Sequence, residues 1–215
     1  MKYVSILLSA AAFVASTSAA SAATTVVTSG TRGVSVIGGG PVAQTFLATD
    51  SLLTNFGFQF ATSAVASTSA NVTFSLLSGP GLGGPTLTSS TTSLEGLTFR
   101  TGTTFYDVFN GSFVLDAGQT YTALLTTTSS NLSLLFGPSA GQMSDAYTNG
   151  SLIKNDAVDT VCGRGVCDAN FRFTTMAAPV SPVPETSTWI MILTGFGLVG
   201  AGLRYRRRSA KVTYA

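Results

Sequence analysis

The feature that most constrains the fold is a strict alternation of large apolar residues with small or polar ones in the segment LLTNFGFQFAT, residues 52–62. One parity holds phenylalanines and the other holds polar residues or glycine, namely Phe56, Phe58 and Phe60 against Asn55, Gly57 and Gln59. Because successive side chains of a strand point to opposite faces, this pattern predicts a strand with one buried face.

Further segments repeat this pattern, and no stretch of ten or more residues between the two ends of the chain keeps a helical period. The clearer strands are expected at residues 71–78, 112–115, 120–128, 132–136 and 170–175, and weaker ones at 24–29, 44–49 and 143–147. The pair 112–115 and 120–128 predicts a hairpin that turns at Gly118. Glycine-rich stretches at 37–41 and 78–87 are interpreted as connections. We therefore expect an all-β body over residues 23–178, an antiparallel, jelly-roll-like β-sandwich.

Both ends of the chain carry segments of a different kind. Residues 1–22 have a lysine at position 2, continue with a short apolar stretch and end in Ala20-Ser21-Ala22, which predicts a cleaved secretory signal peptide. Near the other end, three prolines within residues 179–185 predict an extended linker.

The C-terminal segment is predicted to be a single transmembrane helix. Residues 186–203 contain no charge, and eighteen helical residues span about 27 Å. Residues 204–215 form a basic tail that stays cytoplasmic under the positive-inside rule. The spacing G-x-G-x-x-G at residues 195–200 falls inside this span without a preceding strand or a following acid, so a dinucleotide site is excluded.

Charge and composition exclude several functions. Between Ala23 and Val183 there are five basic and eight acidic residues, a net charge of about −3 (5 − 8), and a mildly acidic body argues against nucleic-acid binding. The chain has no histidine, so it lacks the residues for a Ser-His-Asp or Cys-His site. We expect no catalytic, cofactor-binding or metal-binding residues and no enzymatic activity.

The only cysteines, Cys162 and Cys167, are expected to form a disulfide in an exported protein. Zinc binding needs more ligands, and redox pairs usually have a C-x-x-C spacing. Acidic and amide residues gather late in the body, and we interpret them as turn residues, with a calcium site as the alternative. They are Asp145, Asn149, Asn155, Asp156, Asp159, Asp168 and Asn170.

The body resembles the choice-of-anchor family of exported β-sandwich domains. The resemblance rests on QTFLATDSLLTNFGFQF, NVTFSLLSGPGLGGPTL, FVLDAGQTYTALL and DANFRF, and covers most of residues 44–174. It implies a jelly-roll-like surface domain and transfers no site residues.

The C-terminus resembles the PEP-CTERM sorting domains of Gram-negative bacteria, in the subtype that contains a tryptophan. Those domains combine a Pro-Glu-Pro signature, a transmembrane stretch and an arginine-rich tail. Here Thr186 stands where the second proline is expected, and Ile190 replaces the usual alanine. The sorting signal comprises Pro184, Glu185, Trp189, Gly195, Phe196, Gly197, Arg206, Arg207 and Arg208.

This resemblance implies recognition and cleavage near Pro184-Glu185 by an exosortase, a membrane enzyme for which the chain is the substrate. The protein would be held by the cytoplasmic membrane before processing and would then pass to the cell surface or the extracellular matrix. The family is commonly linked with exopolysaccharide. We therefore expect an exported, non-enzymatic surface or matrix protein.

Three alternatives stay open. A carbohydrate-binding module would show exposed aromatic residues such as Tyr106, Tyr121 or Tyr147 on one flat face. A glycan-active enzyme would need two acids that converge across a cleft. In the third alternative, the C-terminal segment is never cleaved and stays as a permanent anchor.

Overall fold

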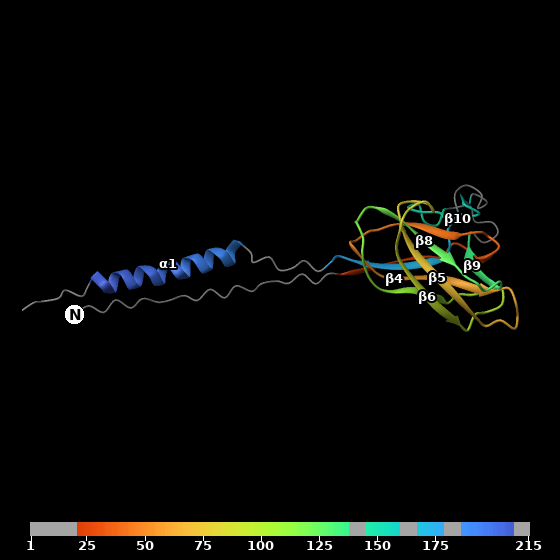
Figure 1. Cartoon of the computed structure of the whole chain (residues 1–215), viewed down its shortest axis with the longest axis horizontal. Coiled ribbons are helices and arrows are strands. Elements are labelled where there is room, and N and C mark those ends of the chain that lie inside the picture. The colour runs from red at the N-terminus through yellow and green to blue at the C-terminus, as the bar shows by residue number, and fades with distance from the viewer. Residues whose placement is uncertain (1–20, 138–144, 160–166, 179–185, 209–215) are drawn as a thin grey trace, which may run out of the picture. The chain divides into compact units, whose positions relative to one another are not determined.

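The computed structural model describes residues 21–137, 145–159, 167–178 and 186–208 (Figure 1). The chain divides into two compact units, Met1–Ala178 and Pro179–Ala215. The first unit contains the β body, and the second contains a helix.

The described part of the body forms twelve strands. They are β1 (Ala22–Val27), β2 (Arg32–Ser35), β3 (Val42–Leu47), β4 (Leu52–Thr62), β5 (Ser69–Ser78), β6 (Thr86–Glu95), β7 (Phe105–Val114), β8 (Thr120–Thr126), β9 (Leu132–Phe136), β10 (Leu152–Lys154), β11 (Ala157–Val158) and β12 (Phe171–Met176).

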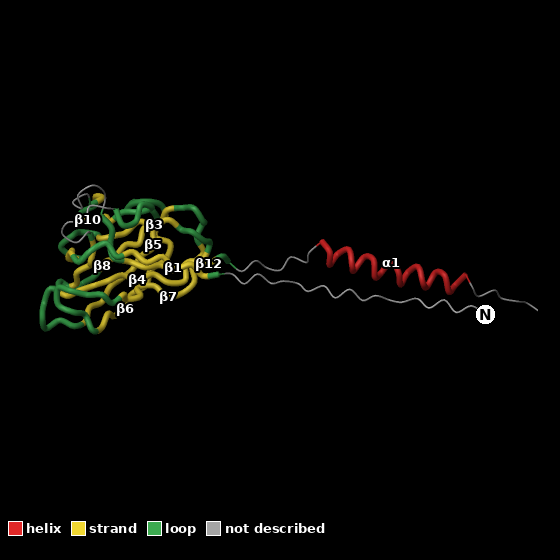
Figure 2. Tube along the Cα trace, turned by 180° about the vertical axis from the view of Figure 1, so that it is seen from behind, coloured by secondary structure: helices red, strands yellow, loops and turns green. Residues whose placement is uncertain are grey.

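These strands make two sheets of six strands each, in which neighbouring strands run antiparallel (Figures 1 and 2). The first sheet has the order β1-β12-β4-β9-β2, with β7 paired to β4. The second has the order β11-β10-β3-β8-β5-β6. Many neighbours are distant in sequence, so most of the sheet pairing comes from long-range contacts.

A layer of phenylalanines joins the two sheets. Phe56 of the first sheet lies 5.0 Å from Phe46 and 5.6 Å from Phe74 of the second, measured between ring centroids. Phe171 and Phe173 of β12 stack on Phe56 at 5.8 Å each. All five rings are at most 1% exposed. Burying a large apolar side chain contributes about 1.5–3 kcal/mol, so this layer is a main source of the stability of the body.

The expectation of an all-β body with antiparallel sheets and one C-terminal helix is confirmed. The alternation in residues 52–62 places Phe56, Phe58 and Phe60 in the core, as predicted. No strand occurs at residues 145–147, the described part of the weak candidate 143–147, whose remaining residues lie outside the described ranges.

The expected hairpin at Gly118 is wrong. β7 pairs with β4 in the first sheet, whereas β8 pairs with β3 and β5 in the second. The connection crosses between the sheets, because Leu115 is buried and the N–H of Gly118 donates to the carbonyl of Ala48 at 2.8 Å. Gly118 is nevertheless a turn residue, with a φ of 82° that favours glycine.

The two ends of the body lie side by side. Ala22 of β1 is the direct partner of Met176 of β12, and the ladder continues through Ala23 with Thr175 (Figure 2). The expected signal-peptide cleavage site therefore falls at the start of β1, while residues 1–20 lie outside the described part. The start of β1 and the end of β12 therefore lie at the same end of the sheet.

The second unit contains α1 (Thr186–Arg208), a helix of 23 residues. Every residue with a described side chain in it, from Trp189 to Tyr205, is exposed. Among the described residues, no helix reaches the combined length and apolarity required of a membrane span. The predicted transmembrane role of residues 186–203 thus stays a prediction.

Candidate functional site

The expected sorting signal lies partly on α1. Trp189 is 55% exposed and Phe196 is 75% exposed. Gly195 and Gly197 leave open space on the helix surface, because an added Cβ would meet no atom within 4 Å. Arg206, Arg207 and Arg208 form the last residues of the helix. Pro184 and Glu185 lie outside the described residues.

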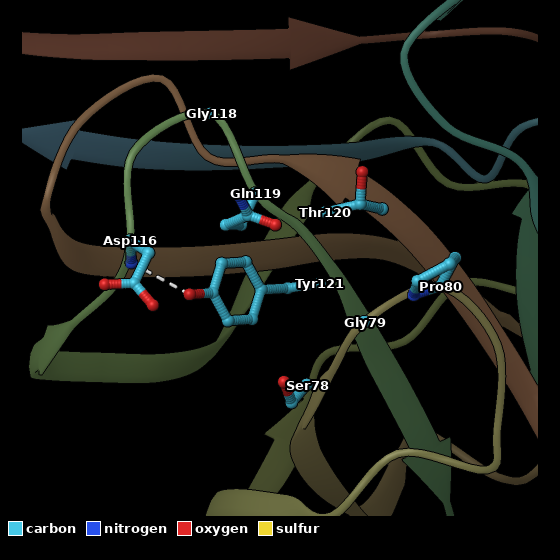
Figure 3. A pocket seen from close by; sticks show the side chains of 8 residues that line it. All are labelled: Ser78, Gly79, Pro80, Asp116, Gly118, Gln119, Thr120 and Tyr121. Atoms are coloured by element: carbon cyan, nitrogen blue, oxygen red, sulfur yellow. Dashed lines mark hydrogen bonds between the residues drawn. The ribbon is translucent and has the colours of Figure 1, made fainter.

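A hollow of about 400 Å³ opens between the end of β5 and the turn before β8 (Figure 3). Its lining residues are Ser78, Gly79, Pro80, Asp116, Gly118, Gln119, Thr120 and Tyr121. The Tyr121 hydroxyl accepts a hydrogen bond from the Asp116 backbone N–H at 2.8 Å, which ties the strand to the turn (Figure 3). Asp116 supplies the only carboxylate among the eight lining residues.

The three tyrosines named for a carbohydrate platform pack against core rings, and Tyr106, which is partly exposed, lies 6.4 Å from Phe60. Tyr121 is only 5% exposed and lies 6.1 Å from Phe46 in the core. Tyr147 packs edge-on against Phe171 at 5.3 Å, and its hydroxyl accepts the Leu47 N–H at 3.1 Å. Burial raises the pKa of Tyr147, the Leu47 N–H lowers it, and the Asp168 charge raises it further. These rings support the fold rather than a flat binding face.

Asp168, which is buried, and Asp145, which is partly exposed, form a carboxyl pair beside Tyr147. Asp168 is 1% exposed, and its Oδ1 accepts a hydrogen bond from Gln44 Nε2 at 3.0 Å. Burial raises the pKa of Asp168 to about 7; the Gln44 hydrogen bond and the Tyr147 N–H lower it, while a hydrogen bond and charge from Asp145 raise it. Burial and the neighbouring acid thus favour the protonated form of Asp168.

Three other acidic and amide residues of this region, Asn155, Asp156 and Asp159, have local structural roles. Asn155 and Asp156 have positive φ angles of 52° and 60° and form the turn between β10 and β11. Asp159 forms an ion pair with Lys154, with Nζ 2.5 Å from Oδ2. Within the described ranges, no group of three or more acids or cysteines is arranged to hold a metal ion. The turn interpretation is supported for Asn155 and Asp156.

Cys167 is buried and disulfide-bonded. Its backbone N–H donates to the Asp159 carbonyl at 2.8 Å, and its carbonyl accepts the Leu152 N–H at 2.6 Å. Cys162, the other cysteine of the expected pair, lies outside the described residues.

An ion pair that the sequence pattern did not indicate crosses the outer face of the first sheet. Arg172 of β12 donates from Nε at 3.2 Å and from Nη2 at 2.8 Å to Asp107 Oδ1 of β7. The guanidinium also lies 5.4 Å from the ring centroid of Phe105. Gly57 of β4 lies between the two strands and is the direct partner of both charged residues. A lone glycine inside an alternating strand was the one sequence signal for this close approach.

Comparison with protein-family models and with curated proteins gives no match to this chain. The fold and the site define its class: a β protein of two antiparallel sheets, followed by a separate C-terminal helix.

Proposed function

We propose that the protein is an exported, non-enzymatic surface or extracellular-matrix protein that an exosortase sorts through its C-terminal segment. The host is a Gram-negative bacterium, and the mature protein associates with exopolysaccharide. The proposal extends the resemblance of residues 182–208 to the PEP-CTERM domains.

The observation that carries the proposal is the exposure of apolar side chains along α1. Ile190, Met191, Leu193, Leu198 and Val199 are 59–70% exposed. Apolar surface of this extent is unfavourable in water and is usual where lipid or another protein covers it. The uncharged stretch and the arginines that end the helix fit a membrane segment with a cytoplasmic tail.

The separation of the body from the C-terminal segment supports the release step. β1 and β12 pair with each other, and all strands that the structure describes lie between Ala22 and Met176. Cleavage near Pro184-Glu185 would remove α1 and leave every described strand in the body. The proposal includes a jelly-roll-like assignment for the two sheets, which the long-range strand order and the choice-of-anchor resemblance support.

The non-enzymatic part of the proposal is supported by the arrangement of the acids. The two carboxylates of a glycosidase stand about 5–9.5 Å apart across an accessible cleft. Asp145 and Asp168 instead both accept the N–H of Tyr147, and Asp168 is buried. The hollow at Asp116 contains one carboxylate among its lining residues.

The test is the mass of the mature protein, produced with an active exosortase and, as the control, with the enzyme's nucleophile replaced. Cleavage near Pro184-Glu185 that depends on the active enzyme would support the proposal. A mature product that still contains residues 189–203 in both strains would overturn sorting and leave the permanent anchor.

A further inference from the structure

We propose that the outer face of the first sheet binds an uncharged saccharide between the Phe105 ring, the Arg172–Asp107 pair and the amides of Asn55 and Asn110. We call these five residues the saccharide face. The inference deepens the proposed function, on which it rests for its biological setting, by naming a ligand class and a site.

The strand register brings the saccharide face together in adjacent rows. Asp107, Gly57 and Arg172 are direct partners across β7, β4 and β12. In the next row Asn55 of β4 is the partner of Asn110 of β7. Side chains directly opposite each other on antiparallel strands have Cβ atoms about 4.5–5.5 Å apart. Because Phe56 and Phe171 point into the core, Asn55 and Arg172 point away from it.

Several polar groups of the saccharide face are free to bind a ligand. Both hydrogen bonds from Arg172 end on Asp107 Oδ1. Among the described residues, nothing hydrogen-bonds to Asp107 Oδ2, to Arg172 Nη1 or to the side-chain amides of Asn55 and Asn110. The side chains of Arg172 and Asp107 are each 35% exposed, so the pair is held in place and still accessible.

Gly57, at the centre of this face, leaves room for the ion pair. A Cβ at position 57 would lie 2.8 Å from Asp107 Oδ1 and 3.3 Å from Arg172 Nε. Only glycine therefore allows the ion pair to pack directly against the backbone of the sheet. Beyond the pair, Asn170 donates to Gln59 Oε1 at 2.8 Å and to the Gly30 carbonyl at 2.7 Å. Gln59 in turn donates to the Thr103 carbonyl at 3.0 Å. These bonds hold the loops that contain Gly30 and Thr103, and the two loops form the boundary at one end of the face.

The charge balance of the saccharide face favours an uncharged ligand. Arg172 and Asp107 neutralise each other, and the other three members of the face are uncharged. An anionic ligand would be repelled by the Asp107 carboxylate, which lies beside the guanidinium. A cationic ligand would be repelled by the guanidinium of Arg172. A saccharide hydroxyl both donates and accepts, so adjacent hydroxyls match the free carboxylate oxygen, the guanidinium N–H and the amides. The partly exposed Phe105 ring supplies the apolar contact that the C–H face of a sugar ring requires.

The test uses the full chain, purified in detergent, and measures retardation in native gels that contain dextran, laminarin or galactomannan as neutral probes. Alginate serves as the anionic probe, and Ca²⁺ alone as the cation probe. The double variant Asn55→Ala/Asn110→Ala and the single variant Asp107→Asn remove the binding groups. Thr91→Ala/Ser93→Ala is the matched control, since it removes exposed hydroxyls from β6 of the other sheet. Thermal unfolding of each variant shows whether it is folded.

We expect at least one neutral probe to bind, with affinity reduced about tenfold or more in folded Asn55→Ala/Asn110→Ala, and unchanged in the β6 control. No binding of any neutral probe, binding of alginate or Ca²⁺ alone, or equal losses in the control would each overturn the inference. If Asp107→Asn is unfolded, the result for Asn55→Ala/Asn110→Ala alone tests the inference. Sorting is read separately from the mass of the mature protein, so either proposal can fail without the other.

Discussion

The carboxyl groups of Asp145 and Asp168 meet at one backbone N–H. Tyr147 donates to Asp145 Oδ1 at 3.0 Å and to Asp168 Oδ2 at 2.9 Å. Burial and the neighbouring acid raise the pKa of Asp168 to about 7, while its ordinary value is 3.8. The folded protein therefore binds a proton that the unfolded chain releases between these two values.

This difference predicts a pH-dependent stability. The folded-state pKa is raised, so the stabilisation from protonated Asp168 is complete below about pH 4 and is lost as the pH rises to about 7. We expect this group to lower the thermal midpoint between pH 5 and pH 8. Asp145→Asn removes the like charge, lowers the pKa of Asp168 and weakens this slope. Thermal unfolding of both proteins over this pH range is the measurement, and equal slopes would contradict the role of Asp145.

Gly57→Ala is expected to destabilise the first sheet. The new Cβ would lie 2.8 Å from Asp107 Oδ1 and 3.0 Å from the Tyr106 carbonyl, so the ion pair has to move. Overpacking of this kind typically costs about 1–3 kcal/mol. Gly33→Ala on β2 is the matched control, because its nearest atom is Ser133 Cβ at 3.5 Å, an ordinary contact. Urea unfolding measures both, and an equal loss of stability in the two variants would show that the ion pair does not require glycine at position 57.

Replacing Leu76 and Leu87 by alanine tests whether β5 is more deeply buried than β6 in the second sheet. Leu76 of β5 is fully buried, whereas Leu87 of the neighbouring β6 is 37% exposed. We expect Leu76→Ala to lower the free energy of unfolding by about 2–5 kcal/mol, because it leaves a cavity in the core. Leu87→Ala should cost about 1 kcal/mol or less. Chemical denaturation gives both values, and comparable losses would mean that β6 is covered more closely than its exposure indicates.

The sequence predicted the parts of the fold that depend on local patterns. The alternation that contains Phe56 marks β4, and similar patterns mark β5, β8 and β12. β6 was missed because its sequence, TLTSSTTSLE, places only one fully buried residue, Leu94, on the core side. The hairpin at Gly118 was wrong because turn residues do not reveal whether a chain reverses within one sheet or crosses to the other.

The candidate site was harder to predict, since it depends on register. Arg172 and Asp107 are 65 residues apart and meet only because β4 lies between β12 and β7. No spacing in the sequence specifies that neighbour order. The sequence places Asp145 and Asp168 in an acidic group, but the burial of Asp168 and the N–H that both acids share depend on the position of Tyr147 against Phe171.

Thr186→Pro is expected to increase the fraction of protein that an exosortase processes, because it restores the second proline of the sorting signature. The helix should tolerate the change. α1 begins at Thr186, and proline fits the first turn, where the backbone N–H has no partner within the helix. Thr186→Ala is the control, since it changes the same position without adding proline. Quantitative mass spectrometry of cleaved and uncleaved protein in the two variants is the measurement. Equal processing of Thr186→Pro, Thr186→Ala and the natural chain would show that the enzyme does not read this position.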